Sequence, residues 1–267
     1  MDQIDLIGLQ RKHESEETSF ILDYTRRTRD LCVNEYLNEI KSTFNPREQI
    51  FLDTSFYQLT CLKTLNFLLR NNVLKKANKA LQFMQKCVGY TLEVEKLVTR
   101  ERNIVAPIYI IDEMVGHKKG YESLIKNNCD IPNHGVEKSS LCGIKTNLRE
   151  VSYGINRITT ILYNRLNEHK RSFKEYSRTK IKKEIDKLFP EEEVSNEDKD
   201  LVGLALEQAV QRPSRIISRD PITASLIDIL EENMQDLRKS LNNRGVNIRI
   251  ALSPNPIFTV NALFYVN

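Results

Sequence analysis

The feature that most constrains the fold is a short apolar run that ends in an acidic residue. Residues 49–52 (QIFL) are followed directly by Asp53 and by the hydroxyl residues Thr54 and Ser55. A run of this length, closed by turn-forming residues, is typical of a buried strand. In an open α/β sheet, the carboxyl ends of the strands border the ligand crevice. Because an aspartate is costly to bury unless a positive group meets it, this stretch predicts a binding site at the end of a strand.

Composition sets broad limits on the protein. The chain has 267 residues, of which 40% are hydrophobic and 28% are charged, so we expect a hydrophobic core with a well-solvated surface. The net charge of +4 favours no particular partner. No segment approaches the roughly 18 apolar residues of a membrane span, and no signal peptide is visible. Five irregularly spaced cysteines are typical of reduced thiols. We therefore expect a soluble, cytoplasmic protein with no membrane partner.

Apolar segments that read as strands alternate along the chain with amphipathic segments that read as helices. The expected strands lie at about 49–52, 104–111, 215–218, 246–252 and 257–266, the second of these leading into a helix at Asp112. The expected helices span about 14–43, 55–100, 141–188, 195–211 and 224–241. Such alternation predicts an α/β fold with a mostly parallel sheet.

Four acidic residues lie where these elements begin or end. Asp53 and Asp220 each follow a strand, Glu113 lies in the expected opening turn of a helix, and Asp198 lies in the first turn of another. Each one alone is more often a helix cap or a surface residue. Carboxylates gathered at one edge of a sheet would repel one another, and a hard cation such as Mg²⁺ or Mn²⁺ relieves that repulsion. Together the four predict a divalent-cation site.

In this order, four short blocks resemble those of PIN domains, which are metal-dependent nucleases that usually cut RNA. The blocks are 51–55 (FLDTS), 106–120 (APIYIIDEMVGHKKG), 196–206 (NEDKDLVGLAL) and 216–220 (IISRD). The resemblance implies a PIN-like three-layer sandwich around a mostly parallel central sheet. It also implies a ribonuclease that acts on single-stranded or structured RNA through Mg²⁺ or Mn²⁺. By the same resemblance, four residues take the acidic, catalytic and metal-binding positions: Asp53, Glu113, Asp198 and Asp220. Thr54 and Ser218 take the supporting hydroxyl positions.

The chain departs from the PIN pattern in two places. The gap between the second and third blocks is long, and helices precede the first strand. We therefore expect a helical extension over 1–47 and a PIN-like domain over 48–267, with a helical insertion at about 121–194. The third block offers two acids, and Asp198 is favoured because Leu201 and Ala205 follow it three and seven residues on. Asp200 is kept as a neighbouring metal ligand, whereas Asp112 would point about 100° away from Glu113 on a helix.

Basic residues concentrate in the stretch 165–187 and occur near the expected site. With Phe173 and Tyr176 among them, they could follow an RNA backbone and stack on unpaired bases. The RNA-binding candidates are Lys118, Lys119, Lys170, Arg171, Lys174, Arg178, Lys182, Lys183 and Arg219. The alternative is a solvated helix whose lysines pair with neighbouring acids such as Glu184 and Asp186.

Other functions are also compatible with this sequence. The first is a non-catalytic adaptor that keeps the fold and binds RNA, another protein or a second copy of the chain through its added helices. A haloacid-dehalogenase-type phosphatase would need a second acid where Ser55 stands. A zinc site built from His117, Cys129, His134 and Cys142 would match none of the usual ligand spacings. We expect Cys32, Cys61 and Cys87 to be small core residues.

Overall fold

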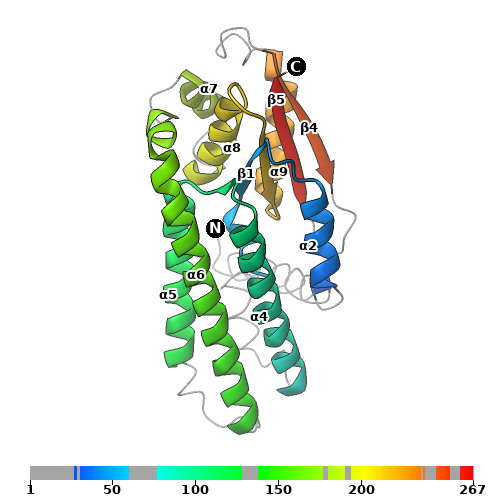
Figure 1. Ribbon diagram of the computed structural model, residues 1–267, viewed down its shortest axis with the longest axis vertical. Helices are drawn as coiled ribbons and strands as arrows, with labels where there is room; N and C mark the ends of the chain where they lie inside the picture. The colour runs from blue at the N-terminus through cyan, green and yellow to red at the C-terminus, as the bar shows by residue number, and fades with distance from the viewer. Residues whose placement is uncertain are drawn as a thin grey trace, which may run out of the picture.

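The computed structural model describes residues 27–28, 31–59, 77–127, 138–176, 180–189, 194–235, 237, 245–252 and 259–266 (Figure 1). These residues form an α/β protein with seven α-helices, one short 3₁₀ helix and five strands. The helices are α2 (Val33–Ser42), α4 (Ala77–Arg100), α5 (Ile108–Asn127), α6 (Lys138–Tyr176), α7 (Lys180–Leu188), α8 (Asn196–Gln208) and α9 (Pro221–Glu232), with the 3₁₀ helix η1 at Thr54–Phe56. The strands are β1 (Gln49–Leu52), β2 (Ile104–Val105), β3 (Ser214–Ser218), β4 (Val246–Leu252) and β5 (Val260–Val266). No helix of the described part is long and apolar enough to cross a membrane.

The five strands form one open sheet in the order β2-β1-β3-β5-β4. Strand β1 runs parallel to both of its neighbours, with Phe51 opposite Val105 of β2 and Ile216 of β3. Strand β5 runs antiparallel to both β3 and β4. The sheet is therefore mixed, and only its β2-β1-β3 part matches the expected parallel arrangement. The physical reason lies in the short connection from Leu252 to Val260, because a parallel crossover needs about a dozen residues or more.

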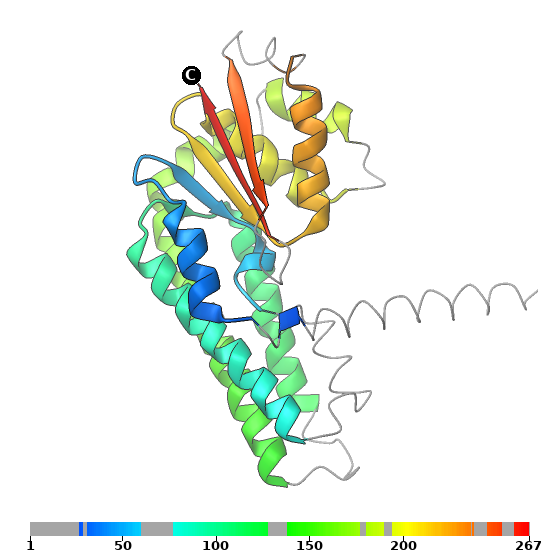
Figure 2. The same cartoon turned by 90° about the vertical axis from the view of Figure 1, so that its right-hand side faces the viewer.

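Helices cover both faces of the sheet, and β1 contributes to the core on each side. Ile50 and Leu52 join the core formed with α2, α4, α5 and α6, whereas Phe51 joins the core formed with α8 and α9. This alternation follows from the two-residue period of a strand. Figure 2 shows α9 on one side of the strands and α2 on the other. Because β1 is buried on both faces, its only route to solvent is through its ends.

Three long helices, α4, α5 and α6, lie side by side and extend beyond the sheet (Figures 1 and 2). Buried residues of α6, among them Leu148 and Ile155, belong to the same core as Ile50. Arg165 of α6 donates to the carbonyl oxygens of Val98 at 2.5 Å and Glu101 at 2.9 Å, at the end of α4. Carbonyl oxygens at the end of a helix lack partners within it, so Arg165 acts here as a C-cap of α4 rather than as a free basic side chain.

Most predicted elements are confirmed, but some boundaries differ. The expected strand at 104–111 ends at Val105, and α5 already begins at Ile108. Pro107 explains the early start, because it immediately precedes the helix and its carbonyl oxygen accepts from Ile111 N at 3.3 Å. Glu113 consequently lies in the second turn, where the helix dipole has little influence. The expected helical stretch 55–100 is wrong at its start, because residues 54–56 form the 3₁₀ helix η1 and residues 57–59 are not helical. Residues 60–76 lie outside the described residues, and residues 77–100 form one continuous helix.

Candidate functional site

The carboxyl end of β1 is the point where the chain changes direction across the sheet. From β1 the chain passes to β2 on one side, and it later returns to β3 on the other side. Side chains that follow the parallel strands therefore meet at one edge, beside the usual ligand crevice of an α/β sheet. Asp53 follows β1 immediately, and its backbone N donates to Ile217 O of β3 at 3.0 Å.

Three short hydrogen bonds hold the Asp53 carboxylate. Oδ1 accepts from the backbone N of Thr54 at 2.7 Å, so Asp53 caps the 3₁₀ helix η1. Oδ2 accepts from the hydroxyls of Ser55 at 2.5 Å and Ser218 at 2.7 Å. Asp53 is buried, and these donors offset much of the cost of burying its charge. The carboxylate thus has a fixed orientation at the end of the strand.

Asp220 is placed beside Asp53 by the end of β3. Ser218 Oγ donates to Asp53 and accepts from Asp220 N at 2.9 Å, which links the two acids through one hydroxyl. Asp220 Oδ1 accepts from Ile222 N at 2.9 Å, so this residue is also the N-cap of α9. Burial and the negative charge of Asp53 both raise the pKa of the Asp220 carboxyl, although the Ile222 hydrogen bond opposes the shift.

Glu113 reaches the same region from α5. Its Oε2 accepts from Thr54 Oγ1 at 2.6 Å, which ties the helix to the segment that follows β1. Its Oε1 lies 3.7 Å from Nε2 of His117, one helical turn further on. Two adjacent residues after β1 therefore contribute to the site. Asp53 is one of its acids, and Thr54 orients another, Glu113.

Asp198 completes the group from the first turn of α8. Ser195 caps this helix, accepting from Asp198 N at 3.1 Å and donating to its Oδ2 at 2.7 Å. The pKa of the Asp198 carboxyl is raised to about 6, mainly by burial and also by the negative charges of Asp53, Asp220 and Glu113, while the Ser195 hydrogen bond opposes the shift. Such Coulomb effects act beyond direct contact, so they place Asp198 within range of the three other charges without placing it against them. The structure thus brings all four predicted acids to one edge of the sheet.

Asp200, the other acid of the third block, has a different environment. Its Oδ1 accepts a short hydrogen bond from Lys182 Nζ of α7, and the same amine lies 3.7 Å from Asp186. Asp200 is therefore neutralised at the contact between α7 and α8. This contact accounts for both Asp200 and Lys182 without a metal or a nucleic acid.

The structure distributes the remaining basic candidates over several surroundings. Arg219 donates to the carbonyl oxygens of Ser55, Gln58 and Leu59 and lies over the Tyr90 ring at 5.2 Å. These hydrogen bonds connect the segment after Asp53 to the end of β3, so we assign Arg219 a structural role. Lys118 bridges to Asn156 of α6 at 2.9 Å.

The other basic candidates lie on exposed or undescribed parts of the chain. Lys119 and Lys183 are exposed. Lys170, Arg171 and Lys174 lie on the described backbone of α6 with side chains outside the described part, and Arg178 is outside it altogether.

The donor set suits a hard divalent cation. Carboxylate and hydroxyl oxygens are the ligands that Mg²⁺ and Mn²⁺ prefer. Within the described ranges, none of the four carboxylates forms an ion pair with lysine or arginine. In the same part of the chain, no three His, Cys, Asp or Glu side chains already lie together as a ready set of metal ligands. The residues therefore fit a cation chemically, and binding would require their side chains to draw together.

Some members of this region carry no signal that a single sequence reveals. Ser55 bridges the two strands, since it donates to Asp53 and accepts from Arg219 N at 3.0 Å. Tyr57 is fully buried with its hydroxyl unpaired among the described residues, and burial together with the charge of Asp53 raises its pKa. Lys199 is only 1% exposed, and its amine has no hydrogen-bond partner in the described part of the chain. Of these three residues, only Ser55 has a signal in the sequence, which is its place in the Asp-Thr-Ser run after a strand.

Replacing Lys199 by methionine should stabilise the protein. A buried ammonium without a partner is costly, and an apolar side chain of similar length removes that cost. We expect Lys199→Met to raise the free energy of unfolding by about 1–3 kcal/mol in urea denaturation. Lys183→Met, at an exposed position of α7, serves as the control and should change stability little. A clear loss of stability in Lys199→Met would show that the amine has a partner that matters.

The raised pKa of Asp198 predicts a pH-dependent stability without metal. An acid that binds its proton more tightly when folded makes the folded state less stable as pH rises through that range. With chelator present, we therefore expect Asp198→Asn to be more stable than the original protein by about 1–2 kcal/mol at pH 7–8. This figure allows for solvent screening, because the Asp198 carboxyl is partly exposed. The difference should vanish as pH falls from about 6 toward about 4. If denaturation curves show the same stability difference between Asp198→Asn and the original protein at every pH in this range, the raised pKa of Asp198 is contradicted. Asp228→Asn, at an exposed position of α9, is the control.

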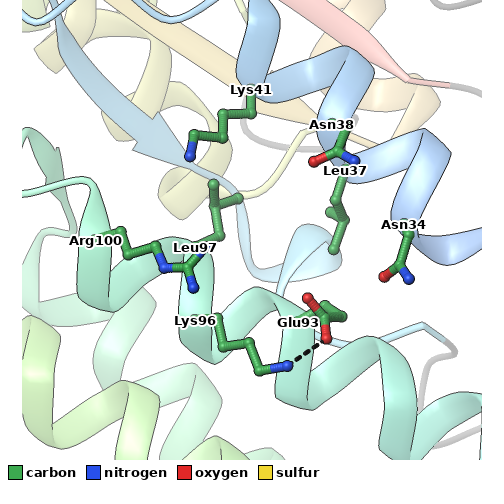
Figure 3. Close-up of a pocket in the computed structure, with 8 residues that line it drawn as sticks. All are labelled: Asn34, Leu37, Asn38, Lys41, Glu93, Lys96, Leu97 and Arg100. Atoms are coloured by element: carbon green, nitrogen blue, oxygen red, sulfur yellow. Dashed lines mark hydrogen bonds and ion pairs between the residues drawn. The ribbon is translucent and has the colours of Figure 1, made fainter.

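A separate groove lies between α2 and α4 (Figure 3). It has a volume of about 60 Å³ and is lined by Asn34, Leu37, Asn38, Lys41, Glu93, Lys96, Leu97 and Arg100. Lys96 is paired with Glu93 at 2.6 Å, and Lys41 with Glu101 at 3.2 Å. None of the four acids lines it. We interpret it as a solvated surface groove that is not part of the acidic site.

The cysteine expectations are met only in part. Cys87 is buried, and burial raises its pKa to about 12, as befits a core thiol. Cys32 is exposed just before α2, so its expected core position is wrong. Cys61, Cys129 and His134 lie outside the described residues.

Comparison with protein-family models, curated proteins and solved structures gives no match to this chain. The geometry of the acidic edge is therefore the basis on which a function can be proposed.

Proposed function

We propose that this protein is a metal-dependent ribonuclease with a PIN-like three-layer fold, whose site is formed by Asp53, Glu113, Asp198 and Asp220. The observation that carries the proposal is the electrostatic environment of Asp198. Its carboxyl is affected by the negative charges of the other three acids, and no lysine or arginine of the described part neutralises any of them. Such a group of like charges is costly for stability, and a cation-binding function explains why it is kept.

Each of the four acids would have its own part in holding the cation. Asp53, fixed by three hydrogen bonds, and Asp220, fixed as a helix cap, would hold the cation from the sheet side. Glu113 and Asp198 would approach from α5 and α8. A bound Mg²⁺ or Mn²⁺ would supply the positive charge that activates water and stabilises the leaving oxygen of a phosphodiester. Because four carboxylates repel a phosphate backbone, these residues can accept RNA only when a cation is present.

Single-stranded or looped RNA fits this edge best. A nucleic-acid backbone must reach carboxylates that lie at the end of a buried strand, and an unpaired segment can be drawn in more easily than a regular duplex. The exposed amines of Lys119 and Lys183 could contribute non-specific phosphate contacts.

Metal removal provides the direct test. We expect the protein to cut a labelled single-stranded RNA in the presence of Mn²⁺ and to stop when EDTA is in excess. We also expect Mn²⁺ to raise the melting temperature in a saturable way, because a ligand that binds only the folded state stabilises it. Equal cutting with Mn²⁺ and with EDTA would reject a metal-carboxylate mechanism.

One observation favours a second candidate, a non-catalytic adaptor that binds RNA or protein. In the described part, the carboxylates are not already arranged as a set of ligands. An adaptor would show RNA or protein binding without cleavage and no melting-temperature increase with Mn²⁺. The metal titration therefore separates the two candidates even where the preferred RNA is unknown.

A further inference from the structure

Both oxygens of the Glu113 carboxylate have a neighbour that can orient them. Thr54 Oγ1 donates to Oε2 at 2.6 Å, and His117 Nε2 faces Oε1 at 3.7 Å. The second distance is longer than a direct hydrogen bond, so at this separation the contact is electrostatic. Glu113 itself is exposed, and without such neighbours its long side chain would sample several rotamers.

The hydrogen bonds around the His117 ring determine which of its nitrogens carries the proton. Gln58 is oriented with its amide oxygen toward Tyr121 Oη, at 3.1 Å, and with its amide nitrogen toward His117 Nδ1. An amide NH₂ can only donate, and Nδ1 must therefore accept with its lone pair. In the neutral ring the proton then lies on Nε2, the nitrogen that faces Glu113.

The inner end of this chain of side chains is buried, whereas the His117 side chain is 26% exposed. Gln58 is 4% exposed and Tyr121 is 2% exposed. The space beside the His117 ring is lined by Thr54, Tyr57, Gln58, Met114, His117 and Ile155, and it leaves essentially no room for a water molecule, about 0 Å³. Gln58 and Tyr121 therefore hold the Nδ1 side of the His117 ring in a region with little space for water.

We propose that His117, held by Gln58 and Tyr121, is a positioning residue that directs its Nε2–H toward Glu113 and so fixes this carboxylate at the acidic edge. This inference rests on the proposed metal site. Histidines commonly orient neighbouring groups through one ring nitrogen while a hydrogen bond to the other nitrogen fixes the tautomer. Groups that orient metal ligands typically contribute about 10- to 100-fold to metal affinity.

Nitrogen NMR of the histidine rings tests the geometry without reference to activity. We expect the His117 signals, assigned by their loss in His117→Leu, to report a neutral ring protonated at Nε2. Tyr121→Phe removes a single hydroxyl and should shift His117 toward a mixture of tautomers, because the Gln58 amide is then free to turn. A ring protonated mainly at Nδ1 in the original protein would overturn the inference.

Mn²⁺ affinity, measured by calorimetry, tests the role. We expect His117→Leu to weaken Mn²⁺ binding about 10-fold, while His117→Gln, whose amide nitrogen can replace Nε2, should retain most of the affinity. Glu122→Gln, an exposed change on the same helix, is the control.

If the original protein binds Mn²⁺ and both His117 variants bind it as tightly as Glu122→Gln does, the positioning role of His117 is rejected and the metal site stands. If the original protein binds no Mn²⁺, both proposals fail. If His117→Leu does not fold, Tyr121→Phe replaces it in the test. We expect Tyr121→Phe also to weaken Mn²⁺ binding, but by less than the loss of about 10-fold expected for His117→Leu.

Discussion

Asp53→Asn is expected to reduce Mn²⁺-dependent RNA cleavage by at least about 100-fold, since even groups that only orient metal ligands contribute about 10- to 100-fold. Asp53 is the most constrained of the four acids, because three donors hold it at the end of β1. The amide keeps the shape but removes the charge that a cation requires. The measurement is kcat/KM on a labelled single-stranded RNA, with the Mn²⁺-induced change in melting temperature as a second readout.

The substitution should leave the fold intact, which makes the loss of activity interpretable. The asparagine oxygen can still accept from Thr54 N, and its NH₂ can donate to Ser55 and Ser218, whose hydroxyls can rotate to accept. Asp112→Asn is the matched control, since this acid is exposed on α5 beside Glu113. Unchanged cleavage by Asp53→Asn, or an equal loss in Asp112→Asn, would remove the basis for the proposed site.

Arg215→Met is expected to lower the free energy of unfolding by about 3–5 kcal/mol, the usual cost of leaving one half of a buried ion pair. Arg215 of β3 is buried and binds Glu48 through two hydrogen bonds, Nε to Oε2 at 2.7 Å and Nη2 to Oε1 at 3.0 Å. Its Nη1 also donates to Asn261 Oδ1 of β5 at 2.6 Å. The methionine leaves a buried carboxylate without a positive partner, and urea denaturation measures the loss.

A double variant tests the explanation. Adding Glu48→Gln to Arg215→Met removes the uncompensated charge, so a large part of the lost stability should return. Glu184→Gln, at a surface ion pair with Lys187 on α7, should cost at most about 1 kcal/mol and serves as the control. If Arg215→Met and Glu184→Gln cost the same, the buried pair does not stabilise the sheet as inferred.

The sequence predicted those parts of the fold that depend on local patterns. The bounds of β1 and β4 are confirmed, and so are the Ser195 cap of α8 and the helix that Pro221 opens. Each depends on side-chain periodicity or on turn and cap chemistry within a few residues. The mixed direction of the sheet was not predicted, although the short connection between β4 and β5 already excluded a parallel pairing between these two strands.

The acids of the candidate site could be chosen from the sequence, but their supports could not. Asp53 and Asp220 are recognisable because they follow apolar strands, and parallel strands place such residues together. Ser55 had only its place after Asp53 as a signal, and Gln58 and His117 were not recognisable as supports, since a glutamine or histidine in a turn or helix is ordinary by itself. Their roles arise from contacts with β3 and α5 that no local pattern encodes.

What the sequence alone determined is therefore the sheet-forming segments and the presence of an acid at their ends, because hydrophobic period and turn chemistry act over a few residues. Only the tertiary structure decided how each charged group is used. Asp198 is affected by the charges of the other acids whereas Asp200 is neutralised by Lys182, and Arg219 binds carbonyl oxygens instead of remaining available to a phosphate. The physical reason is that burial and Coulomb interactions depend on distance in space, and residues far apart in the chain set those distances.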